Sequence, residues 1–334
     1  MTNSDFQKIA EEVQVFLAEN PEWRSRYQEY GEKISANIDY IKTVRRSFHE
    51  WSPLNVYMNI SSAKNAVNSI RFELRYLGQT VADLKANTKA GHKLSTKRYE
   101  KINCRDFGCD ICLSDADWKG DDVAKFRTFF KQRKGDHNAE SGKNGREHEL
   151  ESQLLTEFST TIDKVIRQIK PVKIGGVRFP MPTPISASDH KTLKYSGPHG
   201  GGIDLFTRIG TGGPATRLCI IELKDENEPD EPPRDALKQA VAYATFIREL
   251  LRSDAGLIWW KIFGFGGKIP ETLELYAACA MPSNENNDYS FKDMEVNIGN
   301  DTIKLHYLYF TEEGDRIIIE PKINTSLPIE PRKP

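Results

Sequence analysis

The stretch Gly200–Lys224, GGGIDLFTRIGTGGPATRLCIIELK, decides the fold of the chain. Two segments rich in aliphatic residues, 203–209 and 218–223, lie on either side of the loop GTGGPAT at 210–216, whose residues favour turns. This order predicts two antiparallel strands joined by a turn. The second strand is apolar until its end, so the charged side chains that close it need an explanation.

The register of this hairpin brings charged side chains together. Pairing Ile209 with Arg217 across the loop places Asp204 directly opposite Glu222. Side chains alternate along a strand, so Glu222 and Lys224 share a face. Like charges that face each other across strands are destabilising, and a hard divalent cation such as Mg²⁺ would remove that cost. We interpret the patch as a metal site; the alternative is a solvated face with ordinary charged residues.

Asp204, followed by Glu222-Leu223-Lys224, resembles the D…(D/E)xK signature of the PD-(D/E)XK nuclease superfamily, which has the restriction-endonuclease-like fold. That fold begins with a helix that carries a glutamate. A helical pattern over 146–169 offers Glu147 for this position, with Glu151 as the alternative.

Two residues downstream agree with the same resemblance. Gln239 and Tyr243 match the QxxxY motif of the RecB-like branch, and they lie four residues apart in a helical pattern over 235–252. The resemblance covers about 147–280. One departure is the acidic stretch Asp225–Glu231, which we expect to be a solvated loop because it would repel a phosphate backbone nearby.

The resemblance implies a function as well as a fold. It implies that Mg²⁺ or Mn²⁺ is bound by Asp204, Glu222, the Leu223 carbonyl and Glu147, and that Lys224 orients the attacking water. Gln239 and Tyr243 would hold the phosphate or Lys224, although core packing is an alternative for Tyr243. The implied substrate is DNA, with RNA not excluded, in restriction, defence or repair. A catalytically idle nucleic-acid-binding or scaffold protein that retains the fold is the alternative.

The expected architecture is α/β: an αβββαβ core, with a mixed sheet flanked by helices, preceded by a mainly helical N-terminal domain with a β-hairpin. The hairpin is predicted at 69–84 around Gly78, where apolar and polar residues alternate. The segment KGDHNAESGKNG has no aliphatic residue and many turn formers, so it predicts a linker. The resulting boundaries are 1–133 for the N-terminal domain, 134–146 for the linker and 147–334 for the nuclease domain.

Three cysteines lie close together in the N-terminal segment. Cys104, Cys109 and Cys112 form C-x4-C-x2-C, but a tetrahedral zinc site needs a fourth ligand, and neither His92 nor His137 has convincing spacing. Whether these thiols bind a metal stays open. The remaining two cysteines are predicted to be buried strand residues: Cys219 and Cys279.

Two further groups of residues allow a nucleic-acid role or an ordinary structural one. Trp259-Trp260 favours core packing over base stacking. Basic clusters interleaved with aromatic residues in the N-terminal segment could contact DNA or form a solvated helix face. These clusters are Lys42 with Arg45-Arg46, Lys97-Arg98, and Lys131 with Arg133-Lys134.

Composition limits the remaining possibilities. With 47 Lys and Arg against 48 Asp and Glu, the formal net charge is −1, so any DNA binding must come from a local patch. No apolar run approaches the roughly 20 residues that a membrane helix needs. An odd cysteine count without an export signal indicates reduced thiols and a cytoplasmic location. The oligomeric state is left open, with a dimer possible.

Overall fold

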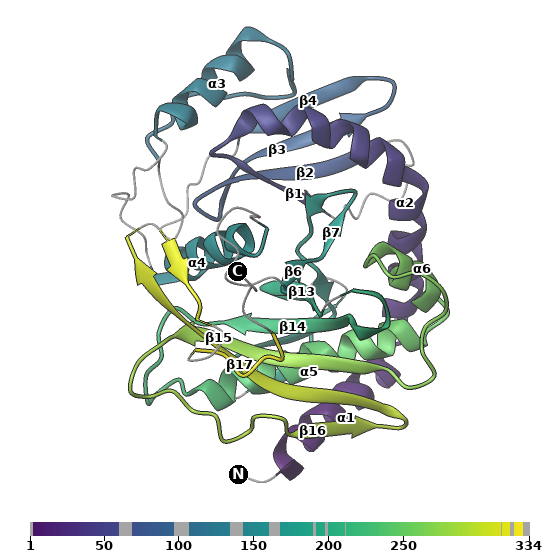
Figure 1. Cartoon of the computed structure of the whole chain (residues 1–334). Helices are drawn as coiled ribbons and strands as arrows, with labels where there is room; N and C mark the ends of the chain where they lie inside the picture. The colour runs from purple at the N-terminus through teal and green to yellow at the C-terminus, as the bar shows by residue number, and fades with distance from the viewer. Residues whose placement is uncertain are drawn as a thin grey trace. The chain divides into compact units, whose positions relative to one another are not determined.

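The structure is a computed structural model of the chain (Figure 1). It describes residues 3–59, 69–96, 107–133, 143–159, 168–189, 192–197, 200–210, 212–314, 316–320 and 324–329.

The chain forms two compact units, and both are built from separate stretches of sequence. The first unit contains residues 1–32, 153–172 and 180–334; the second contains 33–152 and 173–179. The predicted boundary at 134–146 is therefore not the boundary between these units. Residues 134–142 lie outside the described residues, and 143–146 begin a helix.

A mixed sheet forms the core of the first unit. Its strand order is β16-β17-β15-β14-β13-β6, with β18 paired to β17. Strand β13 is antiparallel to β6 and β14, whereas β14, β15 and β17 are parallel neighbours. The strands are β6 (Lys170–Pro171), β13 (Leu205–Ile209), β14 (Arg217–Leu223), β15 (Glu274–Pro282), β16 (Glu295–Ile298), β17 (Asp301–Glu313) and β18 (Arg316–Ile318).

Helix α5 (Pro233–Arg252) connects β14 to β15 and packs on the sheet (Figure 1). A crossover helix is what two parallel neighbouring strands require. Helix α1 (Asn3–Glu19) packs against α5, which explains why the first residues of the chain belong to this unit. The ring of Trp23, at the start of α2 (Glu22–Arg45), meets Phe246 of α5 edge-on at 5.7 Å.

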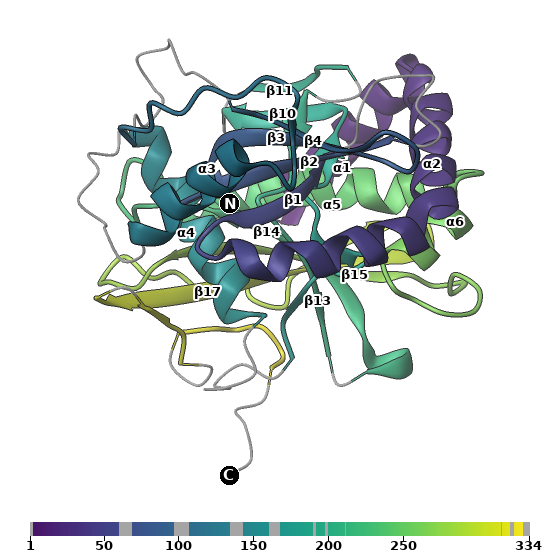
Figure 2. The ribbon, with the colours of Figure 1, turned by 90° about the horizontal axis from the view of Figure 1, so that it is seen from above.

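Short elements complete the first unit. Strands β10 (Ile185–Asp189) and β11 (Thr192–Tyr195) form an antiparallel ribbon (Figure 2). Strands β9 (Pro182–Thr183) and β12 (Gly201–Gly202) form a second one, and α6 (Gly256–Ile262) follows α5.

The second unit contains a sheet that extends the predicted hairpin. Strands β2 (Ser69–Tyr76) and β3 (Gln79–Asn87) are antiparallel, so the hairpin is confirmed. Leu77 and Gly78 both have positive φ, as the tight turn between these strands requires. The sheet order is β5-β4-β3-β2-β1-β8-β7, so the hairpin belongs to a larger sheet than the sequence predicted, although the described helices of residues 1–133 still cover more of that segment than its strands.

The other strands of this sheet are short, and several are polar. They are β1 (Asn55–Asn59), β4 (Gly91–Thr96), β5 (Ala116–Asp117), β7 (Lys173–Ile174) and β8 (Val177–Arg178). The helical parts are the end of α2, the 3₁₀ helix η1 (Arg46–Trp51), α3 (Asp121–Gln132) and the start of α4 (Lys143–Glu157).

Helix α4 is shorter than the predicted helix over 146–169. It ends at Glu157, and residues 158–159 form a turn in which the Ser159 hydroxyl donates a hydrogen bond to the Leu155 carbonyl at 2.5 Å. Residues 160–167 lie outside the described part of the chain. Of the helices that the structure describes, none is long and apolar enough to cross a membrane.

Candidate functional site

The hairpin register places the predicted acidic residues at one end of the sheet. Ile209 pairs with Arg217 and Leu205 with Ile221, so the predicted register is confirmed. Continuing it by one residue puts Asp204 opposite Glu222. The Leu223 amide donates a hydrogen bond to Oδ2 of Asp204 at 3.0 Å, which fixes that carboxylate beside the end of β14.

Glu222 and Lys224 lie next to this carboxylate in a largely buried setting. Glu222 is 5% exposed. The Lys224 side chain is 12% exposed, and its Nζ lies 3.8 Å from Oε1 of Glu222. The Lys224 amide donates to the Ala280 carbonyl at 3.0 Å, which extends the pairing with β15 and holds the lysine backbone against the sheet.

Helix α5 adds Tyr243 to the same site. Burial first, and then the negative charges of Glu222 and Asp204, raise the pKa of Tyr243 well above its ordinary value, so its hydroxyl stays protonated near neutral pH. Its Oη also accepts a hydrogen bond from the Ala187 amide at 3.3 Å.

Gln239 precedes Tyr243 by one helical turn, so both side chains lie on the same face of α5. Gln239 is 2% exposed, and its Oε1 has no hydrogen-bond partner among the described residues. A buried amide oxygen without a partner is uncommon in folded proteins. It is available to a lysine, a water or a ligand at this end of the sheet.

The acidic stretch after β14 is held in place rather than solvated throughout. Asn227 is 2% exposed, and its amide nitrogen donates to the Pro282 carbonyl and to Oδ1 of Asn287, both at 3.0 Å. Glu231, at the end of the stretch, has Oε1 3.4 Å from Nζ of Lys224. This contact was not predicted from the sequence, where the acidic stretch itself was the available signal.

The predicted third carboxylate belongs to the other compact unit. Glu147 belongs to the part of α4 in the second unit, so its role at the Asp204 site stays a prediction. Glu151, the alternative, is 7% exposed and forms an ion pair with Arg75 at 3.8 Å. Arg75 also pairs with Glu73 at 3.0 Å, which places Glu151 in a structural ion-pair network of the second unit.

The cysteines and the histidine singled out in the sequence have separate outcomes. Cys104 and His137 lie outside the described residues, Cys112 is exposed, and Cys109 is half-buried. Within the described ranges, no group of three or more His, Cys, Asp or Glu side chains could hold a metal ion. The two other cysteines are fully buried in strands, as predicted: Cys219 and Cys279.

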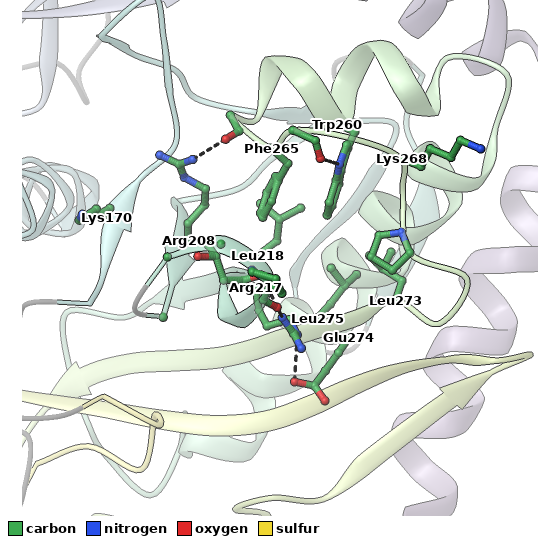
Figure 3. Close-up of a pocket in the computed structure, with 18 of the residues that line it drawn as sticks. Lys170, Arg208, Arg217, Leu218, Trp260, Phe265, Lys268, Leu273, Glu274 and Leu275 are labelled. Atoms are coloured by element: carbon green, nitrogen blue, oxygen red, sulfur yellow. Dashed lines mark hydrogen bonds and ion pairs between the residues drawn. The ribbon is translucent and has the colours of Figure 1, made fainter.

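The structure places both tryptophans of the pair and part of the basic clusters. Trp259 is a core residue whose Nε1 donates to the Tyr27 carbonyl at 2.9 Å, whereas Trp260 lines a pocket of about 760 Å³ in the first unit (Figure 3). Lys42 pairs with Asp39 at 2.9 Å, as on a solvated helix face. Lys97-Arg98 and Lys134 lie outside the part of the chain that the structure describes.

The arrangement provides oxygen ligands from two strands, one ammonium group and one phenol within a single compact unit. Comparison of the chain with protein-family models, with curated proteins and with solved structures gives no significant match in any of the three.

Proposed function

We propose that the chain is a metal-dependent nuclease that hydrolyses DNA phosphodiester bonds. The observation that carries the proposal is the position of Asp204 against the Leu223 amide, next to Glu222 and Lys224, at the end of β14. Burying acidic and basic groups costs free energy, and clusters of such groups are characteristic of binding and catalytic sites.

The order of elements supports a restriction-endonuclease-like core. Along the chain, the main sheet of the first unit receives β6, then β13 and β14, and, after α5 and α6, β15; the strands β7 to β12, which lie between β6 and β13 in the sequence, belong to other sheets. Within the first unit, β6, β13 and β14 are successive antiparallel neighbours, and α5 leads to β15 parallel to β14. With those insertions set aside, this order is compatible with the βββαβ part of the core that the sequence resemblance implies.

The donor set fits Mg²⁺ or Mn²⁺. Asp204 and Glu222 offer carboxylate oxygens, and the Leu223 carbonyl is a neutral oxygen ligand. Mg²⁺ is commonly held by one or two carboxylates, with water and substrate phosphate completing its shell. When bound, such an ion would polarise the scissile phosphate and lower the pKa of a bound water.

The residues around the carboxylates have distinct roles in this proposal. Lys224 orients the attacking water and stabilises negative charge that develops on the phosphate. The protonated hydroxyl of Tyr243 and the amide of Gln239 position the phosphate or Lys224. Glu231 competes with substrate for Lys224, because its carboxylate lies 3.4 Å from the same Nζ.

Replacement of the lysine tests the proposal. In Lys224→Ala, we expect cleavage of plasmid or single-stranded DNA with Mg²⁺ to fall by about 10²–10³, the usual cost of losing a positioned electrostatic group. Lys8→Ala, which removes an exposed lysine from α1, is the matched control and should cleave like the wild type. Melting curves verify that both variants fold. Undiminished cleavage by Lys224→Ala would contradict the mechanism, and DNA binding without metal-dependent cleavage in the wild type would favour the idle scaffold.

A further inference from the structure

Three positive charges form a row across the sheet of the second unit, on strands β2, β3 and β4, which are neighbours in that sheet (Figure 1). The strand register pairs Arg71 of β2 with Lys85 of β3, and the same Lys85 with Lys93 of β4. Side chains that lie directly opposite each other in paired strands are on the same face of the sheet. The three cations therefore stand side by side, on strands that lie about 4.8 Å apart.

This row is on the face of the sheet that meets solvent. Arg71 and Lys85 are exposed, and the side chain of Lys93 is 39% exposed. Because side chains alternate along a strand, the residues that flank the cations point to the opposite face. The flanking apolar residues are at most 4% exposed: Ile70, Phe72, Leu84, Ala86 and Leu94. The sheet thus has one face in the core and one face that carries the cations.

The carboxylates that accompany the row are exposed, and they bind only part of it. Nζ of Lys85 lies 3.3 Å from Oδ1 of Asp115, and Nζ of Lys93 lies 3.3 Å from Oδ2 of Asp117. The two aspartate side chains are 60% and 61% exposed. Exposed ion pairs of this kind contribute about 0–1 kcal/mol and are screened by salt, so another anion can replace them at little cost.

The Arg71 end of the row has positive charge that no described carboxylate offsets. The side chain of Arg71 has no ion-pair or hydrogen-bond partner among the described residues. Burial first, and then the charge of Arg71, lower the pKa of Lys33 in α2. Like charges directly opposite each other destabilise a sheet, so the row itself costs free energy. A polyanion bound along the row would remove that cost.

The next row along the same strands is acidic and confines the positive charge to one line. Glu73 of β2 lies opposite Asp83 of β3. Arg75 forms an ion pair with Glu73 at 3.0 Å, and the Asn59 amide nitrogen donates to Oε1 of Glu73 at 2.9 Å. A narrow basic line beside an acidic one suits a thin, linear polyanion that runs across the strands.

We propose that the row of Arg71, Lys85 and Lys93 binds the phosphodiester backbone of a nucleic acid. The row covers about 10 Å from β2 to β4, and phosphates of one DNA strand follow each other every 3.4 Å or so along the helix axis, so it matches about three of them. Contacts of Arg and Lys with phosphates position a nucleic acid without reading its sequence. The identity of the polyanion rests on the proposed nuclease function, to which the row adds a substrate-holding surface in the second unit.

Fluorescence anisotropy with the full chain tests the proposal. The probes are a fluorescein-labelled DNA duplex of mixed sequence and its labelled single strand, titrated in EDTA across a KCl series. In the triple variant Arg71→Gln, Lys85→Gln and Lys93→Gln, the affinity at low salt should fall about tenfold or more. The slope of log affinity against log salt should become shallower by about 3 for the duplex, or by about 2 for the single strand, because three phosphate contacts are lost. The probe that shows this change identifies the form of nucleic acid that the row holds.

A matched control removes the same number of charges from helices of the chain. It replaces exposed lysines of α2 and α3, and it should bind both probes like the wild type: Lys42→Gln, Lys125→Gln and Lys131→Gln. Asp115→Asn with Asp117→Asn releases two cations of the row and should raise the affinity several-fold at low salt. Melting curves verify that the variants fold. The triple variant should melt at or above the wild-type temperature, because like charges that face each other have been removed.

The proposal and the nuclease function fail in different measurements. The proposal is overturned if the wild type binds neither probe, if the folded triple variant binds both probes like the wild type, or if the control variant loses as much affinity as the triple variant. Cleavage with Mg²⁺ is measured separately. Binding that depends on the row, without cleavage, would overturn the nuclease function alone, whereas cleavage with unchanged binding by the triple variant would overturn this proposal alone.

Discussion

Replacing Asp204 with asparagine should have opposite effects on the protein without metal and on its response to metal. The hairpin register puts Asp204 opposite Glu222, where Cβ atoms of paired residues lie about 5 Å apart. Two charges at that separation repel by about 3 kcal/mol at an effective dielectric constant of about 20. Asp204 is half-buried, and Lys224 lies 3.8 Å from Glu222, so solvent and the ammonium group offset most of this repulsion.

The net gain in the free energy of unfolding should therefore be about 0–1 kcal/mol in EDTA. The asparagine keeps an oxygen that can accept the Leu223 amide hydrogen bond, so the strand end loses no pairing. For a unit of this size, the gain corresponds to a melting temperature that holds or rises by up to about 4 °C.

The metal response should change in the other direction. At a concentration ten times the Kd, an ion that binds only the folded state adds about 1.4 kcal/mol, or about 3–6 °C. If Asp204→Asn raises the Kd tenfold, the same concentration adds only about 0.4 kcal/mol. Thermal melts in EDTA and across a Mn²⁺ series, without DNA, measure both effects. Asp254→Asn, at an exposed position after α5, is the control. Equal metal-induced shifts in the wild type and Asp204→Asn would show that Asp204 is no ligand.

Two further outcomes follow from ion pairs of the first unit. Glu231→Gln removes the carboxylate that lies 3.4 Å from Nζ of Lys224. The KM for DNA cleavage should therefore fall several-fold at low salt. An unchanged KM would show that Glu231 does not compete with substrate. Asp301 is 2% exposed and accepts hydrogen bonds from two arginines of α5 and from the Leu273 amide, so Asp301→Asn should lower the free energy of unfolding by about 3 kcal/mol in urea melts. Burial alone would raise the pKa of Asp301, but these hydrogen bonds lower it. The stabilisation that the Asp301 carboxylate gives the folded state is therefore present above about pH 4 and is lost as the pH falls through the lowered pKa. The free energies of unfolding of the wild type and of Asp301→Asn should then converge in acid.

The local pairing of the central hairpin could be predicted because short-range information fixes it. The turn at 210–216 sets which residues pair, and the apolar run of β14 leaves one register that buries it. The same holds for the hairpin around Gly78, where the turn and the alternation agree. For these two hairpins, the type of element and the strand register could therefore be predicted from neighbouring residues alone.

Contacts between elements that are far apart in the sequence could not be predicted in this way. The apolar stripe of α1 indicates a buried face, but nothing in its sequence says that α5, more than 200 residues later, covers it. Strand β4, GHKLST, is polar and short, and it becomes a strand because β3 and β5 pair with it. Asn227 is likewise held by Pro282 and Asn287, so the acidic stretch could not be distinguished from a solvated loop.

Strand pairing explains how a chain with a net charge of −1 can present sites of opposite sign. At the end of β14, Asp204 and Glu222 concentrate negative charge that suits a cation. Across β2, β3 and β4, the strand register concentrates the positive charges of Arg71, Lys85 and Lys93 in one row that suits an anion. Within each site, neighbouring like charges lie closer together than the Debye length of about 8 Å at physiological salt, whereas exposed charges farther away are largely screened. Each site therefore depends on its own few residues, so net charge says little about what either of them binds.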